Sequence, residues 1–554
     1  MTHVFIFNNA SRAASYGIGT YVKQLANGLS TTSGTRISCV EMYADTKKFS
    51  IENHSDGYTR YLIPPANTQV ENEVYLRTVF YFLARNIQTI EGERLIFQFN
   101  YFQHYLLALL LKASYPSCQI ILSVHYMGWC FELRGNLTDM RRIISEKNSP
   151  SNDKERNVLS SLANEKRFLC LADAVIVLSR STINILREEY KISQHKMHLV
   201  YNGIANDTCN KKNLVNSKRN ILFVGRLDDM KGLRHLISAF IQIADRHPNA
   251  NLTIVGDGDF QTYLKQTRKL HERVSFLGRM ESNEVEEMYQ QAYIGVMPSF
   301  YEQCSYSAIE MMRHGIPLIG TDSGGLSEML DTTPELRVHI DEKNFNETDF
   351  VSQISHRLEL LLSNNTIYQR VSDEVKKIYK ERYTEANMVR DMQDILSIPP
   401  KAQISSDYLI YIDGQMIDLI NRHPDIDIDF YGLGGIGAYL WWRVLTLGSD
   451  SNPNKQQLAL IKENLIYYVD WVEEYAQIAP LSPCLYQILS SMNIHSFFPT
   501  KIERKIINQI EKYKDNVYEL IQKYGLLGYT FYIFLMPFTN IDETRKKILK
   551  KVLE

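Results

Sequence analysis

The sequence predicts an α/β protein with two successive parallel-sheet domains followed by a third, all-helical domain. Short apolar runs rich in β-branched residues alternate with helix-length segments, which is typical of parallel strands covered by helices. This alternation stops at a polar stretch and then begins again. Beyond residue 400 the periodicity is helical throughout. A length of 554 residues suits about three domains.

The first domain is predicted to span residues 1–205. Helix-length segments separate its strand-like runs, which favours a parallel sheet. The predicted strands are Val4–Phe7, Leu95–Phe99, Ile120–Val124 and Ala174–Leu178.

The second domain is predicted to span residues 206–396. It begins with an Asn- and Lys-rich stretch, 206–220, that lacks apolar periodicity and is interpreted as the interdomain linker. Its closing segment, 350–396, reads as consecutive helices. The predicted strands between them are Ile221–Val224, Leu252–Val255, Val274–Leu277, Ile294–Met297 and Pro317–Gly320.

The third domain, residues 407–554, is predicted to be all-helical and follows a double proline at Pro399 and Pro400. We expect it to bind a substrate or another partner, with self-association and coverage of an active-site cleft as alternatives. Its longest apolar run, Leu526–Phe538, is shorter than the roughly 20 residues that span a bilayer. It is interpreted as core, with a peripheral membrane contact as the alternative.

Composition narrows the class of protein. The net charge of −2 gives no reason to expect a nucleic-acid partner. The seven cysteines show no C-x-x-C spacing, which argues against a zinc site and against a disulfide framework. The N-terminus runs directly into a strand without a signal-peptide pattern, so we expect a cytoplasmic protein.

Two carboxylates flank a predicted helix start in the second domain. Glu302 and Glu310 are separated by seven residues, after a buried-strand pattern. If the helix begins near Ser305, both side chains border the crevice at the carboxyl ends of the strands. The backbone N–H groups of Cys304, Ser305, Tyr306 and Ser307 would then face an anion. Phosphate is the expected occupant.

Two cations follow the first strand of the second domain. Arg226 and Lys231 lie in the segment 224–232, V-G-R-L-D-D-M-K-G, on a turn toward the next helix. Charge-assisted hydrogen bonds contribute roughly 1.5–3 kcal/mol each. Together the two side chains could replace a metal ion in neutralising a diphosphate.

The pattern G-R-L-x-x-x-K-G followed by E-x7-E resembles the retaining glycosyltransferases of family 4, over roughly residues 1–396. The resemblance implies the GT-B fold of two facing Rossmann-like domains. It also implies that Arg226 and Lys231 bind the donor diphosphate, Glu310 the ribose hydroxyls, and Glu302 the donor sugar.

Further matches lie in the first domain. The segment 17–20, with Gly17 and Gly19, looks like the family's glycine loop beside the phosphates, and His125 resembles the histidine presented to the donor sugar. Segment 200–204 resembles the entry into the second domain. One departure is Ser305, where the family commonly has glycine.

Each of these residues also has a structural interpretation. The two glutamates alone could be a solvated pair at a helix start, and the glycines could serve only a turn. His125 alone could be structural, and Cys304 is interpreted as packing because no histidine adjoins it in sequence. Aspartates 228, 229, 257 and 259 lie in predicted turns, so no metal is assigned.

The resulting hypothesis is a retaining, metal-independent glycosyltransferase. Its donor would be a UDP-sugar or GDP-sugar, its acceptor a protein, peptide or glycan, and no other cofactor is expected. The alternatives are a GT-B epimerase or phosphorylase and a non-catalytic, transferase-like subunit that binds a partner. A dinucleotide-dependent oxidoreductase is poorly supported, since no G-x-G-x-x-G follows a strand.

Overall fold

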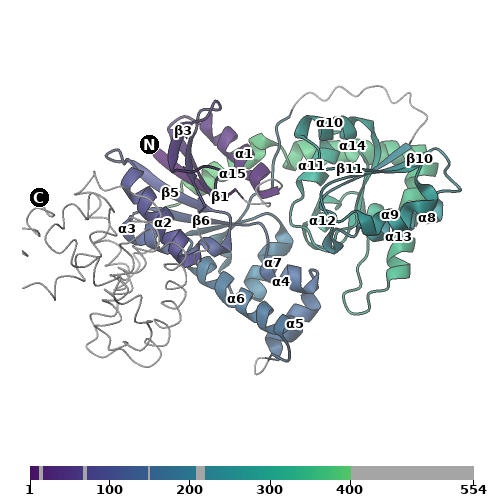
Figure 1. The fold of residues 1–554 in the computed structure, drawn as a ribbon, viewed down its shortest axis with the longest axis horizontal. Helices are drawn as coiled ribbons and strands as arrows, with labels where there is room; N and C mark the ends of the chain where they lie inside the picture. The colour runs from purple at the N-terminus through teal and green to yellow at the C-terminus, as the bar shows by residue number, and fades with distance from the viewer. Residues whose placement is uncertain (11–16, 66–71, 116, 147–149, 207–218, 401–554) are drawn as a thin grey trace, which may run out of the picture.

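The computed structural model describes residues 1–10, 17–65, 72–115, 117–146, 150–206 and 219–400. These residues form two α/β domains that lie side by side (Figure 1). The predicted helical domain at 407–554 lies outside the described residues, as does most of the predicted linker.

The first domain is built on a sheet with strand order β3-β4-β2-β1-β5-β6-β7-β8. Its paired strands are parallel except for β3, which is antiparallel to β4. The strands are β1 Thr2–Asn9, β2 Thr35–Met42, β3 Ser50–Asn53, β4 Thr59–Ile63, β5 Arg94–Phe99, β6 Gln119–Val124, β7 Ala174–Val177 and β8 Met197–Leu199.

Helices connect these strands, and asparagine or serine caps start several of them. The side chains of Asn136, Asn152 and Ser179 each accept a hydrogen bond from a first-turn N–H, which stabilises the helix that follows. The helices are α1 Gly17–Ser30, η2 Phe102–His104, α2 Asn72–Asn86, α3 Tyr105–Ser114, α4 Gly128–Leu133, α5 Leu137–Ser145, α6 Asp153–Leu171, α7 Arg180–Glu188 and η3 Gln194–Lys196.

The second domain has a parallel sheet with strand order β11-β10-β9-β12-β13-β14. The chain runs outward from β9 to β11 and then returns to place β12 on the other side of β9. This reversal opens a crevice at the carboxyl ends of β9 and β12. The strands are β9 Arg219–Val224, β10 Ala250–Val255, β11 Val274–Gly278, β12 Ala292–Met297, β13 Leu318–Thr321 and β14 Arg337–Val338.

The last helix of the second domain, α15, crosses to the first domain. Helix α15 packs against α1 of the first domain, as Figure 1 shows, and Ile395 O accepts a hydrogen bond from Gln119 Nε2 at 3.1 Å. The helices are η4 Asp229–Lys231, α8 Leu233–Ile243, α9 Gln261–Thr267, η5 Arg268–Leu270, α10 Ser282–Gln291, α11 Tyr306–Arg313, α12 Gly324–Met329, η6 Pro334–Leu336, α13 Glu347–Ser363, α14 Asn365–Arg382 and α15 Glu385–Leu396.

Successive side chains along the central strands alternate between two hydrophobic cores. On β1, Val4 and Ile6 enter one cluster, whereas Phe5 and Phe7 enter the other. Successive side chains of a strand point to opposite faces, so helices must cover both faces of this sheet. The first cluster continues into the second domain and therefore ties the two domains together.

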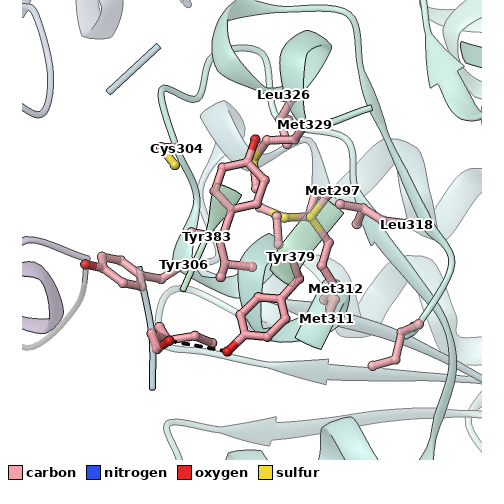
Figure 2. Packing of buried hydrophobic residues seen from close by; sticks show 14 of the residues in the cluster. Met297, Cys304, Tyr306, Met311, Met312, Leu318, Leu326, Met329, Tyr379 and Tyr383 are labelled. Atoms are coloured by element: carbon pink, nitrogen blue, oxygen red, sulfur yellow. Dashed lines mark hydrogen bonds between the residues drawn. The ribbon is translucent and has the colours of Figure 1, made fainter. Parts of the chain in front are cut away.

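Methionine and tyrosine side chains pack around α11 in the second domain. Figure 2 shows Met297, Met311 and Met312 meeting close to Tyr379, whose hydroxyl donates to Ile204 O at 3.3 Å. All three methionines are buried. This packing fixes the helix that carries Glu310.

The predicted fold class of two successive parallel α/β sheets is confirmed, and every predicted strand overlaps an observed one. The predicted run of helices after residue 350 is also confirmed, as α13, α14 and α15. Strands β2, β3, β4, β8 and β14 were not predicted.

Candidate active site

A cleft of about 410 Å³ lies between the two domains and receives the loops that follow β6, β9, β11 and β12. It contains all of the predicted site residues except Gly19. The predicted residues that line it are Gly17, His125, Arg226, Lys231, Glu302, Cys304, Ser305, Tyr306, Ser307 and Glu310.

The glycine segment of the first domain is helical where the structure describes it. Gly17 is the first residue of α1 and lines the cleft together with Ile18 and Thr20. Gly19 lies one residue further along the same helical turn and is not among the lining residues. The segment therefore meets the cleft as a helix start rather than as a loop.

His125 follows β6 and is oriented by Asn100, which follows β5. The His125 Nε2 and Asn100 Oδ1 atoms are 2.9 Å apart, and Asn100 Nδ2 donates to Phe7 O at 2.8 Å. Since the Asn100 oxygen accepts, Nε2 carries the proton and Nδ1 is left as the acceptor of the ring. Burial lowers the pKa of His125 to about 3, so the imidazole is neutral at physiological pH.

A close backbone contact positions Lys231. Gly232, which follows Lys231, has a φ of 65°, and a Cβ there would lie 2.1 Å from Pro298 O. A glycine is therefore required at this position. It allows the turn η4 to pack against the end of β12 and places Lys231 next to Glu302.

Each cation is paired with a carboxylate. Lys231 Nζ forms an ion pair with Glu302 Oε1, and these side chains are only 19% and 13% exposed. Arg226 Nη2 lies 3.1 Å from Asp228 Oδ2, in a more exposed position. An incoming anion must compete with Glu302 for Lys231, since the ammonium group already has an anionic partner.

Glu310 lies on α11 and receives a hydrogen bond from a buried tyrosine. The Tyr289 hydroxyl donates to Glu310 Oε2 at 2.6 Å. Burial raises the pKa of Glu310 to about 7, although the hydrogen bond from Tyr289 opposes the shift. This carboxyl group therefore changes its protonation near neutral pH.

The start of α11 faces the cleft. Ser305 is the N-cap residue, as predicted, but its side chain makes no capping hydrogen bond. First-turn N–H groups have no partner within their helix, and the helix dipole favours an anion beside them. Cys304 is buried, its carbonyl accepts from Asn202 Nδ2 at 2.6 Å, and burial raises its pKa to about 12, which makes it a poor nucleophile.

Several lining residues were not predicted. Arg279 directly follows β11, so the rule that ligands bind at strand carboxyl ends could have identified it. A buried polar side-chain atom without a hydrogen-bond partner is also present in Asn202 and Gln303, which were not predicted, and in Tyr306, which was. All three residues line the cleft. These atoms are available to hydrogen-bond a polar ligand or water in the cleft.

In the described part of the chain, no three His, Cys, Asp or Glu side chains come together in an arrangement that could hold a metal ion. Every helix described is also too short or too polar to cross a lipid bilayer.

Known protein families match both domains. Residues 16–207 match the family described as Glycosyltransferase Family 4, and residues 218–359 match the family described as Glycosyl transferases group 1. An uncharacterized glycosyltransferase of Methanocaldococcus jannaschii is 28% identical over 242 residues, which are 40% of this chain and 60% of that protein. The chain thus spans about three fifths of the length of this relative.

Solved structures share the fold. Sucrose-phosphate synthase from Thermosynechococcus elongatus superposes with a TM-score of 0.56 at 19% identity, over 71% of this chain and 98% of that chain. Anabaena HepE, solved in complex with UDP and glucose, gives 0.53 at 14% identity, over 72% of this chain and 100% of that chain. With its two facing Rossmann-like domains and both family matches, the chain belongs to the GT-B glycosyltransferases of family 4.

Proposed function

We propose that this chain transfers a sugar from a nucleotide diphosphate donor to an acceptor, with retention of anomeric configuration. The observation that carries the proposal is the convergence of Arg226, Lys231 and the start of α11 on one cleft between the two sheets. A diphosphate is the part of a nucleotide sugar that needs this concentration of positive potential.

The donor phosphates would replace Glu302 as the ion-pair partner of Lys231. A diphosphate carries more charge than one carboxylate, so the exchange is favourable for the ammonium group. It also frees the Glu302 carboxylate to accept hydroxyl groups of the donor sugar. Donor binding would thereby convert an internal ion pair into two separate ligand contacts.

The nucleoside and the sugar would lie on opposite sides of the phosphates. The ionised Glu310 carboxylate, which the Tyr289 hydroxyl holds by a hydrogen bond, would accept hydrogen bonds from the ribose hydroxyls. On the side of the first domain, the Nδ1 atom of neutral His125 would accept a hydrogen bond from a hydroxyl group of the donor sugar. The unpartnered polar atoms of Asn202, Gln303 and Tyr306 supply further hydrogen-bonding positions.

The chemical step requires no protein nucleophile. The bond from the anomeric carbon to the phosphate oxygen breaks, and the bonding electrons leave with the diphosphate. The acceptor hydroxyl forms its bond to the anomeric carbon on the same face and passes its proton to the leaving phosphate oxygen. Arg226, Lys231 and the helix dipole stabilise the charge that develops there.

Interdomain contacts support a reaction shielded from water. Asn202 of the first domain donates to Cys304 O of the second, and the Tyr201 hydroxyl donates to Glu328 Oε2 at 3.1 Å. Closing two domains over a donor lowers the rate of its hydrolysis.

A donor panel tests the function. We expect one of UDP-glucose, UDP-N-acetylglucosamine and GDP-mannose to raise the melting temperature of the purified chain, since a ligand at 100 times its Kd adds about 2.7 kcal/mol. Slow hydrolysis of that donor should release the sugar with its original anomeric configuration, observed by NMR. An inverted anomer, or an epimerised sugar formed from donor alone, would replace this proposal with another reaction class. Absence of turnover with a bound donor would favour the non-catalytic alternative.

A further inference from the structure

A second cavity, of about 310 Å³, lies between the two domains and shares no lining residue with the catalytic cleft. From the first domain it is lined by residues 133–136, at the corner between α4 and α5. From the second it is lined by Phe300, residues 322–323, residues 340–342 and Phe345. Small-molecule sites commonly lie at domain interfaces and start at about 300 Å³.

Aromatic rings form the apolar part of this cavity. The rings of Phe300 and Phe345 meet edge to face, with centroids 5.3 Å apart, and both contact Phe350 behind them. Phe345 is nevertheless 40% exposed. A rigid ring held by its neighbours and still open to a cavity can bind the apolar face of a ligand.

Arg134 forms part of the polar rim. It has a left-handed backbone, with φ 52°, which is unfavourable for a residue with a long side chain. Its guanidinium group lies 3.2 Å from Asp229 Oδ2 and 5.9 Å from the centre of the Phe300 ring. The strained turn thus brings a hydrogen-bond donor of the first domain to the edge of the aromatic floor.

Carboxylates make the rest of the rim negative. Asp322, Asp341 and Glu342 line the cavity, and Arg134 is the one basic side chain among its described lining residues. Glu342 is fixed across the domain boundary, because its Oε2 accepts from Thr138 N at 2.9 Å. This charge disfavours phosphates and other anions, whereas hydroxyl groups can donate to the carboxylates.

We propose that this interdomain cavity binds a neutral saccharide unit. An aromatic floor suits the C–H face of a pyranose ring, and a rim of carboxylates and one guanidinium group suits its hydroxyls. The unit is either part of the acceptor glycan or a separate saccharide. Binding itself is independent of the proposed function, and only the first source rests on it.

The cavity is connected to the catalytic cleft through short stretches of chain. Asp229, the partner of Arg134, lies in the same turn as Lys231. Phe300 precedes Glu302 by two residues, and its carbonyl accepts from Ser323 Oγ at 2.5 Å. A saccharide bound here would contact Phe300, which lies on the segment of Glu302, and would be linked to the turn of Lys231 through Arg134.

Saturation-transfer NMR and calorimetry test the binding, with methyl α-D-glucopyranoside, methyl α-D-mannopyranoside and methyl α-D-galactopyranoside as probes. UDP is kept saturating to occupy the nucleoside and diphosphate parts of the catalytic cleft. The Phe345 variants distinguish the cavity from the sugar subsite of that cleft, which UDP leaves open. We expect at least one probe to bind, and glucose 6-phosphate to bind at least tenfold more weakly than methyl α-D-glucopyranoside. Phe345→Ala should weaken the bound probe about tenfold, while Phe260→Ala, at an exposed phenylalanine outside the cavity, should not change it.

Phe345→Leu keeps apolar volume and guards against misfolding, and we expect it to lose most of the same affinity because the flat ring is gone. Binding that is unchanged in both Phe345 variants, or no binding by any of the three probes, would overturn the proposal.

A turnover assay separates the two sources. If the bound sugar serves as acceptor and Phe345→Ala raises its KM about tenfold with kcat retained, the cavity holds an acceptor unit. If the sugar binds but is not glycosylated while donor hydrolysis continues, it is a separate saccharide. Failure of the proposed function would appear differently, as binding of the sugar without any reaction of the donor.

Discussion

The two domains present different chemistry to the cleft they share. The second domain contributes charged side chains, among them Arg226, Lys231, Glu302 and Glu310. The described lining residues of the first domain carry no charge at neutral pH, because Gly17, Ile18, Thr20, Leu178 and Asn202 are neutral and burial keeps His125 unprotonated.

We therefore expect the two domains to have different roles in the reaction. Ionic contacts bind and stabilise a charged leaving group, and they lose strength in solvent-exposed positions. Neutral hydrogen bonds discriminate between hydroxyl groups without adding net charge. We therefore expect the second domain to determine donor affinity and leaving-group departure, and the first domain to determine the alignment of the sugar.

Replacing Lys231 should give the largest effect. We expect Lys231→Ala to lower kcat about 100-fold to 1,000-fold, the range found when one preorganised stabilising group is removed. The affinity for UDP should fall as well, since the ammonium group is proposed to bind phosphate in the ground state too. Steady-state kinetics and calorimetry with UDP measure the two effects.

Lys265→Ala is the matched control, because this exposed lysine lies on α9 and does not line the cleft. It should keep wild-type kinetics. The charged residues that the second domain contributes to the cleft form its charged face, and the residues of the first domain form its neutral face. A folded Lys231→Ala, Arg226→Ala double variant with normal turnover would refute the role of the charged face in leaving-group departure.

Glu310→Gln should raise the donor KM roughly 10-fold to 100-fold, the loss expected for hydrogen bonds to a charged acceptor of about 1.5–3 kcal/mol. With a pKa of about 7, the wild-type carboxyl becomes protonated as the pH falls below 7. The ratio kcat/KM should therefore fall on the acid side, with a limb near pH 7 that the variant lacks. An acid limb that persists in the variant would assign it to another group.

Thermal stability gives a second measurement of the same carboxyl group. Its pKa is raised in the folded state, so the folded protein binds this proton more tightly than the unfolded chain. Its contribution is fully favourable below the unfolded pKa and is lost as the pH rises through about 7. The melting temperature of Glu310→Gln relative to wild type should hence increase between pH 5 and pH 8.

On the neutral face, His125→Ala should lower kcat about tenfold, the loss of one or two neutral hydrogen bonds of about 0.5–1.5 kcal/mol each. The affinity for UDP should remain within twofold of wild type, since UDP lacks the sugar that His125 is proposed to contact. His356→Ala, an exposed position on α13, is the control. A large loss of UDP affinity in His125→Ala would contradict the division between the faces.

The sequence predicted the charged face better than the neutral face. Arg226, Lys231, Glu302 and Glu310 lie in short motifs at the ends of apolar strands, so their convergence follows from parallel-sheet topology. Asn100 and Tyr289 could not be found this way. Each acts through a hydrogen bond to a residue distant in sequence, His125 in one case and Glu310 in the other.

Three of the strands that were not predicted have weak local patterns. Strand β14 has two residues and β8 has three, too few for any periodicity. Strand β3 forms the sheet edge and is mostly exposed, so it lacks an apolar run. The second interdomain cavity was also missed, because residues 133–136 and Phe345 are brought together only by the packing of the domains.

The smallest expected effect is that of a chelator. The charged face supplies two basic side chains and a helix start, which together could provide the positive potential that a divalent cation would otherwise bring to a diphosphate. Activity in excess EDTA should therefore equal activity without it. Lys231→Ala offers the sharper comparison, since added Mg²⁺ or Mn²⁺ could partly restore a variant that has lost one positive charge while leaving the wild type unchanged. Strict dependence of the wild type on added manganese would show that Arg226 and Lys231 do not suffice to neutralise the diphosphate. The charged side of the cleft, contributed by the second domain, would then have to include a metal ion.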